Sequence, residues 1–216
     1  MTMRHKAAIS RGASARRSGR HAARLVTMIV HAAILFLTPT KAVAHDAFGD
    51  LGPFYGNLLH PLADPLQAAV LVGTAAFLAG RSISAVRKAI PIFIVVASCA
   101  SVAAFSGLIN TPPTIFAGMA ALLIGLAATL PQKLVPQPVV YVLVGVTGAI
   151  TGLAPGAPIS GLTLQPLLGS VFGIAGLLAL WWFTLDIAAR QLTHLVPKVV
   201  GSWVAAMGIL IVAFSA

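Results

Sequence analysis

Charged residues are scarce in this sequence. Asp, Glu, Lys and Arg make up only 8% of its 216 residues, whereas a soluble domain carries about 25%. Hydrophobic residues make up 58%, and the mean hydropathy is +0.97. So few charges cannot cover a surface that faces water. The composition excludes an ordinary soluble domain and predicts an integral membrane protein whose main partner is the lipid bilayer.

Cysteine and catalytic motifs are also scarce or missing. The single cysteine, Cys99, excludes a disulfide within the chain and has no CxxC partner for a metal. We expect its thiol to pack inside a helix bundle. The sequence lacks a phosphate-binding loop, an HExxH motif and any Ser–His–Asp pattern. It therefore indicates neither an enzyme nor a tightly bound cofactor.

The positive charge is concentrated at the N-terminus. The formal net charge is +10, yet residues 1–44 hold eight cations and no acid. The rest of the chain holds six cations against four Asp residues. A basic excess confined in this way is typical of a targeting segment, so it does not favour nucleic acid as a partner.

Residues 1–44 have the pattern of a secretory signal peptide. A basic region precedes the apolar run Leu25–Leu37, Pro39 ends that run, and Ala42 and Ala44 supply a small-x-small cleavage site. The alternative is an uncleaved anchor helix. The apolar run is short for a crossing that needs about 20 residues, so cleavage is the prediction.

Cleavage after Ala44 would make His45 the first residue of the mature chain. Its α-amino group and imidazole could chelate one metal ion, with the carboxylate of Asp46 adjacent. The alternative is a polar cleavage junction without a ligand. Residues 45–57 then form a short periplasmic segment, in which Phe54 and Tyr55 are expected at the lipid headgroups.

Apolar segments of membrane-crossing length fill residues 58–216 and predict an all-α domain of six transmembrane helices. Pro61 is tolerated near the first turn of the first helix, and Pro65 is expected to loosen or kink it. The predicted helices cover about 58–80, 89–109, 113–130, 138–153, 162–184 and 198–215.

The links between these segments predict the orientation. All cations after residue 44 fall in alternate links or at their edges, and the links near 110–112 and 155–160 carry no charge. The positive-inside rule places the charged links in the cytoplasm. Both mature termini would then be periplasmic, which makes this a multi-pass protein of the bacterial inner membrane. The cations concerned are Arg81, Arg87, Lys88, Lys133, Arg190 and Lys198.

Glycines recur in the two segments at 138–153 and 162–184. Small residues at helical spacing permit close backbone approach, so these two helices are predicted to pack against each other. The alternative is a pathway lined by backbone carbonyls. The glycines are Gly145, Gly148, Gly152 and Gly156 in or just after the first segment, and Gly169, Gly173 and Gly176 in the second.

Four polar residues form a narrow stripe at the start of the first predicted helix. Asn57, His60, Asp64 and Gln67 are spaced by three or four residues, so on a helix they share one face. Imidazole and carboxylate are suitable ligands for Ni²⁺ or Co²⁺, and an ionisable residue inside a membrane is a functional candidate. The alternative is structural: His60 caps the helix, and Asp64 pairs with it or with amides freed near Pro65.

A second polar group lies at the opposite end of the domain. Asp186 and His194 flank the link after the fifth predicted helix. We expect a solvated link with an i,i+4 pair between Asp186 and Arg190, and an ion exit site is the alternative. Trp181 and Trp182 are expected in an aromatic belt at the inner surface.

The segment FYGNLLHPL, the predicted His45 start and the six spans resemble the HupE/UreJ family. The likeness in residues is best from Phe54 to about Gly80. The resemblance implies a small polytopic protein that accompanies hydrogenase or urease systems and acts as a nickel or cobalt permease.

The sequence departs from the family pattern after His60. The family has an Asp-His pair six and seven residues after that histidine, where this chain has Leu66 and Gln67. The later glycine-rich stretch, 148–156, has no histidine. Two functions therefore remain: a permease for Ni²⁺ or Co²⁺, or a non-transporting membrane scaffold or assembly factor for a metalloenzyme or respiratory complex.

Overall fold

The computed structural model describes residues 51–154 and 163–215. The predictions for the signal peptide, for His45 and Asp46, and for the link at 155–160 lie outside these residues. Within them the chain is helical, with short links and no strand. The predicted all-α class is confirmed for this part of the chain.

The helices follow the predicted order but differ from the predicted bounds. The first predicted helix is two helices, the second begins earlier than expected at Ile83, and the fifth continues to Gln191. The helices are α2 (Gly52–Ala63), α3 (Pro65–Ala79), α4 (Ile83–Phe105), α5 (Thr114–Thr129), α6 (Gln137–Gly152), α7 (Leu164–Gln191) and α8 (Val196–Ser215), with a short 3₁₀ turn η2 (Gln132–Leu134).

The expected distortion at Pro65 is a complete break. Helices α2 and α3 meet at an angle of 71°. The residue before a proline is disfavoured in the α conformation, and Asp64 accordingly takes φ −91° and ψ 106°. Proline at the first position of α3 lacks only an N–H that the helix would leave unused. The Asp-Pro dipeptide therefore ends one helix and starts the next.

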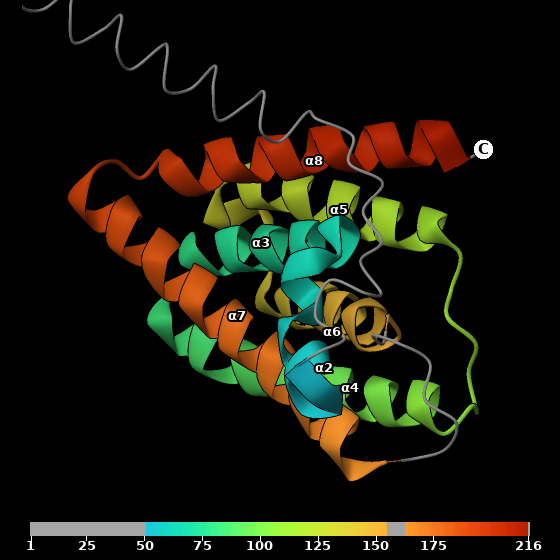
Figure 1. The fold of residues 1–216 in the computed structure, drawn as a ribbon. Coiled ribbons are helices and arrows are strands. Elements are labelled where there is room, and N and C mark those ends of the chain that lie inside the picture. Colours follow the sequence, from blue (N-terminus) through green and yellow to red (C-terminus); the bar gives the residue numbers. More distant parts are fainter. Residues whose placement is uncertain (1–50, 155–162, 216) are drawn as a thin grey trace, which may run out of the picture. The chain divides into compact units, whose positions relative to one another are not determined.

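Helix α3 is the buried centre of the described bundle. Residues Val70, Ala75, Ala76, Phe77 and Leu78 have no measurable exposure. The helix contacts α5, α7 and α8, and Figure 1 shows α5 and α8 running alongside it while α7 crosses obliquely. A helix that is apolar on all sides is expected at such a position.

Glycines bring α5 and α8 into backbone contact. A Cβ added to Gly125 would lie 2.5 Å from the backbone nitrogen of Ala205, and one added to Gly201 would lie 2.6 Å from the Cβ of Ala128. Gly118 in turn faces Ile211. Rising numbers on α5 meet falling numbers on α8, so the two helices are antiparallel. This contact was not predicted from the sequence.

Glycines of α6 and α7 do allow close backbone approach, as predicted, but these glycines pack against other helices and not against each other. Gly148 and Gly152 of α6 face the backbone of α4 at Phe93 and Ala97. The glycines of α7 that pack closely, Gly169 and Gly173, instead face the backbone of α2 at Phe54 and Leu58.

Of the other three glycines of the predicted contact, Gly156 lies outside the described residues, and Gly145 and Gly176 have no atom within 4 Å of an added Cβ. Glycine spacing thus marks a face that can approach a neighbour but does not identify the neighbour.

Arg81 joins the ends of α3 and α5. Its guanidinium donates to the carbonyl oxygens of Ala127 and Gln132, each at 3.4 Å, and lies 4.3 Å from the centre of the Phe77 ring. Gln132 donates in return to the carbonyl of Gly80. Partial burial lowers the pKa of Arg81 because desolvation disfavours the charged form, but arginine remains protonated at neutral pH.

The cationic links therefore gather at one end of the bundle. Arg81 reaches the link that contains Lys133. The antiparallel contact of α5 and α8 brings the start of α8, with Lys198, to the same end. The opposite end holds the α2–α3 break and the start of α5. This arrangement matches the alternation of charged and uncharged links in the sequence.

Three described helices are long and apolar enough to cross a membrane: α4, α7 and α8. The bent pair α2–α3 makes a fourth if it counts as one span. Helices α5 and α6 have 16 residues each, or about 24 Å at 1.5 Å per residue, against a hydrocarbon core of about 30 Å. Exposed apolar side chains such as Trp203 and Phe214 fit a lipid environment.

Two smaller predictions have different outcomes. The pair between Asp186 and Arg190 is confirmed at 2.9 Å, although it lies on the extended end of α7 and not in a link. The expected packing of Cys99 is wrong, because its side chain is exposed on α4.

Candidate functional site

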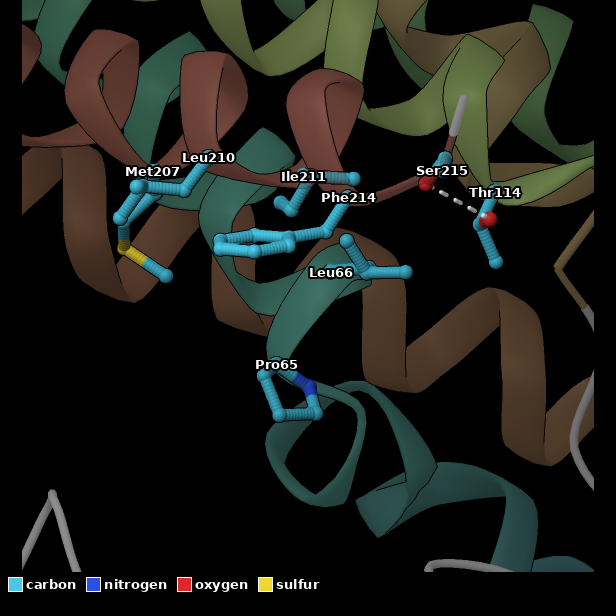
Figure 2. Close-up of a pocket in the computed structure, with 8 residues that line it drawn as sticks. All are labelled: Pro65, Leu66, Thr114, Met207, Leu210, Ile211, Phe214 and Ser215. Atoms are coloured by element: carbon cyan, nitrogen blue, oxygen red, sulfur yellow. Dashed lines mark hydrogen bonds between the residues drawn. The ribbon is translucent and has the colours of Figure 1, made fainter.

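Two cavities adjoin the break between α2 and α3. The larger is an open groove of about 480 Å³ with mostly apolar walls. Figure 2 shows residues of α8, among them Met207 and Phe214, on one side and Pro65 and Leu66 on the other. The hydroxyls of Thr114 and Ser215 form a hydrogen bond of 3.3 Å at one end. No ionisable residue lines the groove, so it provides no charged ligand and no acid or base.

The smaller cavity shares Leu66 and Thr114 with the groove, and its mostly apolar walls include a few polar side chains. Its volume is about 90 Å³. We call it the break pocket. Its polar lining comes from three parts of the chain: the start of α3, the link into α5 with its first residue, and the end of α6. The polar lining residues are Asp64, Gln67, Thr111, Thr114 and Thr151.

Asp64 caps helix α3. Its Oδ1 accepts a hydrogen bond of 2.9 Å from the amide of Leu66, which satisfies one of the four amides that a helix start leaves without a partner. The side chain is partly exposed. The structural alternative raised from the sequence is therefore correct for one carboxylate oxygen: Asp64 pairs with an amide freed near Pro65.

Gln67 links α3 to the end of α6. Its Nε2 donates to the carbonyl oxygens of Thr151 at 2.8 Å and Ala154 at 3.1 Å. Carbonyl oxygens only accept, so the amide nitrogen must face them. The Oε1 atom is buried and has no partner among the described residues. Gln67 is 3% exposed, and this leaves an acceptor without a donor beside the break pocket.

Asn57 and His60 lie on the other side of the break, on α2. Both are buried, with 4% and 8% of their surface exposed. Asn57 donates from Nδ2 to the carbonyl of Pro53 at 2.9 Å, while its Oδ1 is buried and unpartnered within the described part of the chain. The carbonyl of His60 accepts from the amide of Asp64 at 2.9 Å.

The predicted stripe is thus divided in two. The four residues would share one face only on a continuous helix, and the helix bends by 71° at Asp64. Asp64 and Gln67 share the break pocket, whereas Asn57 and His60 do not line it. Among residues 51–154 and 163–215, no three His, Cys, Asp or Glu side chains come close enough to hold a metal ion.

Three threonines of the pocket were not anticipated from the sequence. Thr111 and Thr114 lie beside the uncharged link into α5, and Thr151 lies at the end of α6. The Thr151 hydroxyl donates to the carbonyl of Thr147 at 2.7 Å. No local pattern distinguishes these residues from ordinary helix-end threonines, because they meet Asp64 only in the folded bundle.

Comparison with protein families finds a match over most of the chain. The family model described as HupE / UreJ protein matches residues 32–211. This range includes every described helix except the last turn of α8. The chain belongs to the HupE/UreJ family. No curated protein and no solved structure matches it.

Family membership confirms the resemblance drawn from the segment that begins at Phe54, and it agrees with an apolar, multi-helix membrane protein. Gln67, one of the two positions at which the resemblance predicts an Asp-His pair, is the residue that links α3 to α6.

Proposed function

We propose that this HupE/UreJ chain is a permease of the bacterial inner membrane for a divalent transition metal ion, Ni²⁺ or Co²⁺. It would supply a metalloenzyme such as urease or hydrogenase. Family membership supports the proposal. The single observation that carries it is a buried imidazole, His60, beside the break in the first apolar segment, because ionisable groups within a membrane mark ion pathways.

The proposed topology has six crossings after a cleaved signal peptide at 1–44, with both mature termini in the periplasm. In it, α2 and α3 form one broken span, and α5 and α6 are short spans. Helix α4 contacts α6 in parallel, α2 contacts α7 in parallel, and α5 contacts α8 antiparallel. These directions support six crossings that alternate in direction. Broken helices in transporters place backbone polar groups and ionisable side chains where an ion passes.

The proposed ligands lie at the end of the bundle opposite the cationic links. His60 supplies an imidazole nitrogen, which Ni²⁺ accepts readily, and Asp64 supplies an oxygen. Asn57 and Gln67 supply neutral amide oxygens, and both of these oxygens are buried without a partner within the described residues. His45 and Asp46 would add a chelating pair at the mature N-terminus.

Uptake of radioactive ⁶³Ni by cells that express the chain tests this proposal. We expect His60→Ala to lower the initial uptake rate by about tenfold or more, since loss of groups that support a metal ligand already costs about 10–100-fold. His194→Ala is the matched control, because that histidine is exposed near the start of α8. Equal uptake by wild type and His60→Ala would remove the proposed site.

A non-transporting scaffold for a metalloenzyme or respiratory complex is the second candidate. The observation that favours it is that Asp64 and Gln67 already make structural hydrogen bonds as a helix cap and an interhelical link. A scaffold would purify with a stoichiometric protein partner and without metal. A permease would show metal-dependent uptake without that partner.

A further inference from the structure

Arg81 is a half-buried cation without an acidic partner among residues 51–154 and 163–215. Its guanidinium lies 4.3 Å from the centre of the Phe77 ring, just after the end of α3. The acids in this part of the chain are Asp64, at the α2–α3 break, and Asp186, which pairs with Arg190. Burial of a charge is costly unless an opposite charge or several hydrogen bonds offset it. The described acids therefore do not offset the charge of Arg81.

The hydrogen bonds of Arg81 hold its guanidinium in place but leave donors available. A guanidinium has five N–H donors. Two of them reach the carbonyl oxygens of Ala127 and Gln132, each at 3.4 Å, which is longer than the usual distance of about 2.9–3.0 Å. The planar fork of an arginine matches two oxygens of a phosphate at once. Arg81 is therefore a fixed cation that can still bind a phosphate.

Two lysines lie at the same end of the bundle as Arg81. Lys133 is exposed in η2, the turn whose Gln132 accepts a hydrogen bond from Arg81. Lys198 lies near the start of α8, which the antiparallel contact brings to the end of α5. Helix termini do not offset these charges, because α3 and α5 end here with partial negative charges and α6 and α8 begin here with partial positive ones. We call Arg81, Lys133 and Lys198 the basic cluster.

Exposed apolar side chains adjoin the basic cluster. Leu126 and Leu130 are four residues apart on α5, so they share one face, and 49% and 44% of their surfaces are exposed. Leu134 follows Lys133 in η2 and is 66% exposed. In a membrane protein such side chains contact acyl chains, which are as apolar as leucine. Cations beside an apolar surface fit an amphiphile with an anionic headgroup, whereas a soluble anion would use the cations alone.

We propose that an acidic phospholipid of the adjoining membrane leaflet binds at the basic cluster. The Arg81 guanidinium holds its phosphate, the two lysines attract it, and an acyl chain lies against Leu126 and Leu130 of α5. Basic pockets between transmembrane helices bind acidic headgroups in the same way. The bound lipid offsets the charge of Arg81 and braces the junction of α3, α5 and η2. This site goes beyond the proposed function, because it requires neither metal transport nor the imidazole of His60.

A specific lipid site differs from the general attraction of cations to an acidic membrane surface. Multi-pass proteins commonly carry cations on their cytoplasmic side, and a general attraction depends only on how many there are. Arg81 is instead held by two carbonyls and an aromatic ring. Arg87, one turn into α4, is exposed and makes no hydrogen bond or ion pair with the described residues. The two arginines therefore distinguish the two explanations.

Native mass spectrometry of the purified full-length chain in a neutral detergent tests the site. The protein is given an equal mixture of phosphatidylglycerol and phosphatidylcholine with the same acyl chains. Each Lys or Arg near an acidic lipid is worth about fivefold in affinity, so two or more cations should give a preference for phosphatidylglycerol of about 25-fold or more. Arg81→Gln and Lys133→Gln should each lower this preference by about fivefold. Lys133 is exposed, so its variant keeps the test decisive if Arg81→Gln fails to fold.

Arg87→Gln is the matched control, because it removes one cation from the same end and should leave the preference unchanged. Equal retention of both lipids by the wild type, or an equal effect of Lys133→Gln and Arg87→Gln, would overturn the proposal. Displacement of the lipid by millimolar inorganic phosphate would indicate a site for a free anion, and displacement by a polyglutamate peptide a site for an acidic protein segment. Either displacement would also overturn it. None of these measurements depends on ⁶³Ni uptake, so the lipid site and the permease proposal can fail separately.

Discussion

Gly125→Ala in α5 is expected to destabilise the bundle, although alanine is the better helix former. The added Cβ would lie 2.5 Å from the backbone nitrogen of Ala205 and 2.6 Å from the carbonyl oxygen of Gly201. Backbone atoms inside a helix cannot rotate away, so α5 and α8 must separate. Overpacking of this kind costs about 1–3 kcal/mol, which outweighs the gain of up to about 1 kcal/mol in helix propensity.

The measurement is the thermal midpoint of the detergent-solubilised protein, followed by the loss of monodisperse protein on size exclusion. Gly145→Ala and Gly176→Ala are the matched controls, because an added Cβ at either position meets no atom within 4 Å. These two variants should be unchanged or slightly stabilised. A Gly125→Ala variant as stable as the two controls would show that α5 and α8 do not pack as described.

The sequence predicted much of the local structure. The Asp64–Pro65 dipeptide is a strong local signal, because proline restricts the residue before it, and the helix breaks there. The i,i+4 pair of Asp186 and Arg190 formed for the same kind of local reason. Apolar runs separated by polar links predicted the order of the helices. In each case the residues that decide the structure are neighbours in the chain.

Contacts between distant helices were not predictable in the same way. Gly152 and Gly173 were predicted to be packing residues, but the helix that each one contacts cannot be inferred from the sequence. They face α4 and α2, not each other. All bilayer-exposed and buried faces of such helices are apolar, so the hydrophobic pattern that identifies partners in soluble bundles carries little information here.

In the candidate site, too, contacts between chain neighbours were predictable and contacts between distant helices were not. The cap made by Asp64 follows from its place before Pro65. The bonds from Gln67 to α6 join residues 84 and 87 positions apart, and no spacing rule predicts them. The threonines that complete the break pocket also come from distant parts of the chain, namely the link into α5, the start of α5 and the end of α6. The predicted common face of His60, Asp64 and Gln67 required one continuous helix. Pro65 breaks that helix.

Gln67→Leu is expected to loosen the end of the bundle that holds the α2–α3 break. Leucine has a similar volume but cannot donate to the carbonyls of Thr151 and Ala154, which then lose the donor that Gln67 provides. An unsatisfied buried polar group costs about 1–3 kcal/mol. Removal of the unpartnered Oε1 returns part of this, so the net loss should be about 2 kcal/mol. The thermal midpoint of the detergent-solubilised protein reports the change.

Gln165→Leu makes the same chemical substitution at an exposed position on α7 and should leave the thermal midpoint unchanged. A Gln67→Leu variant as stable as wild type would contradict the role of Gln67 as the link between α3 and α6 and would make its interhelical hydrogen bonds energetically neutral.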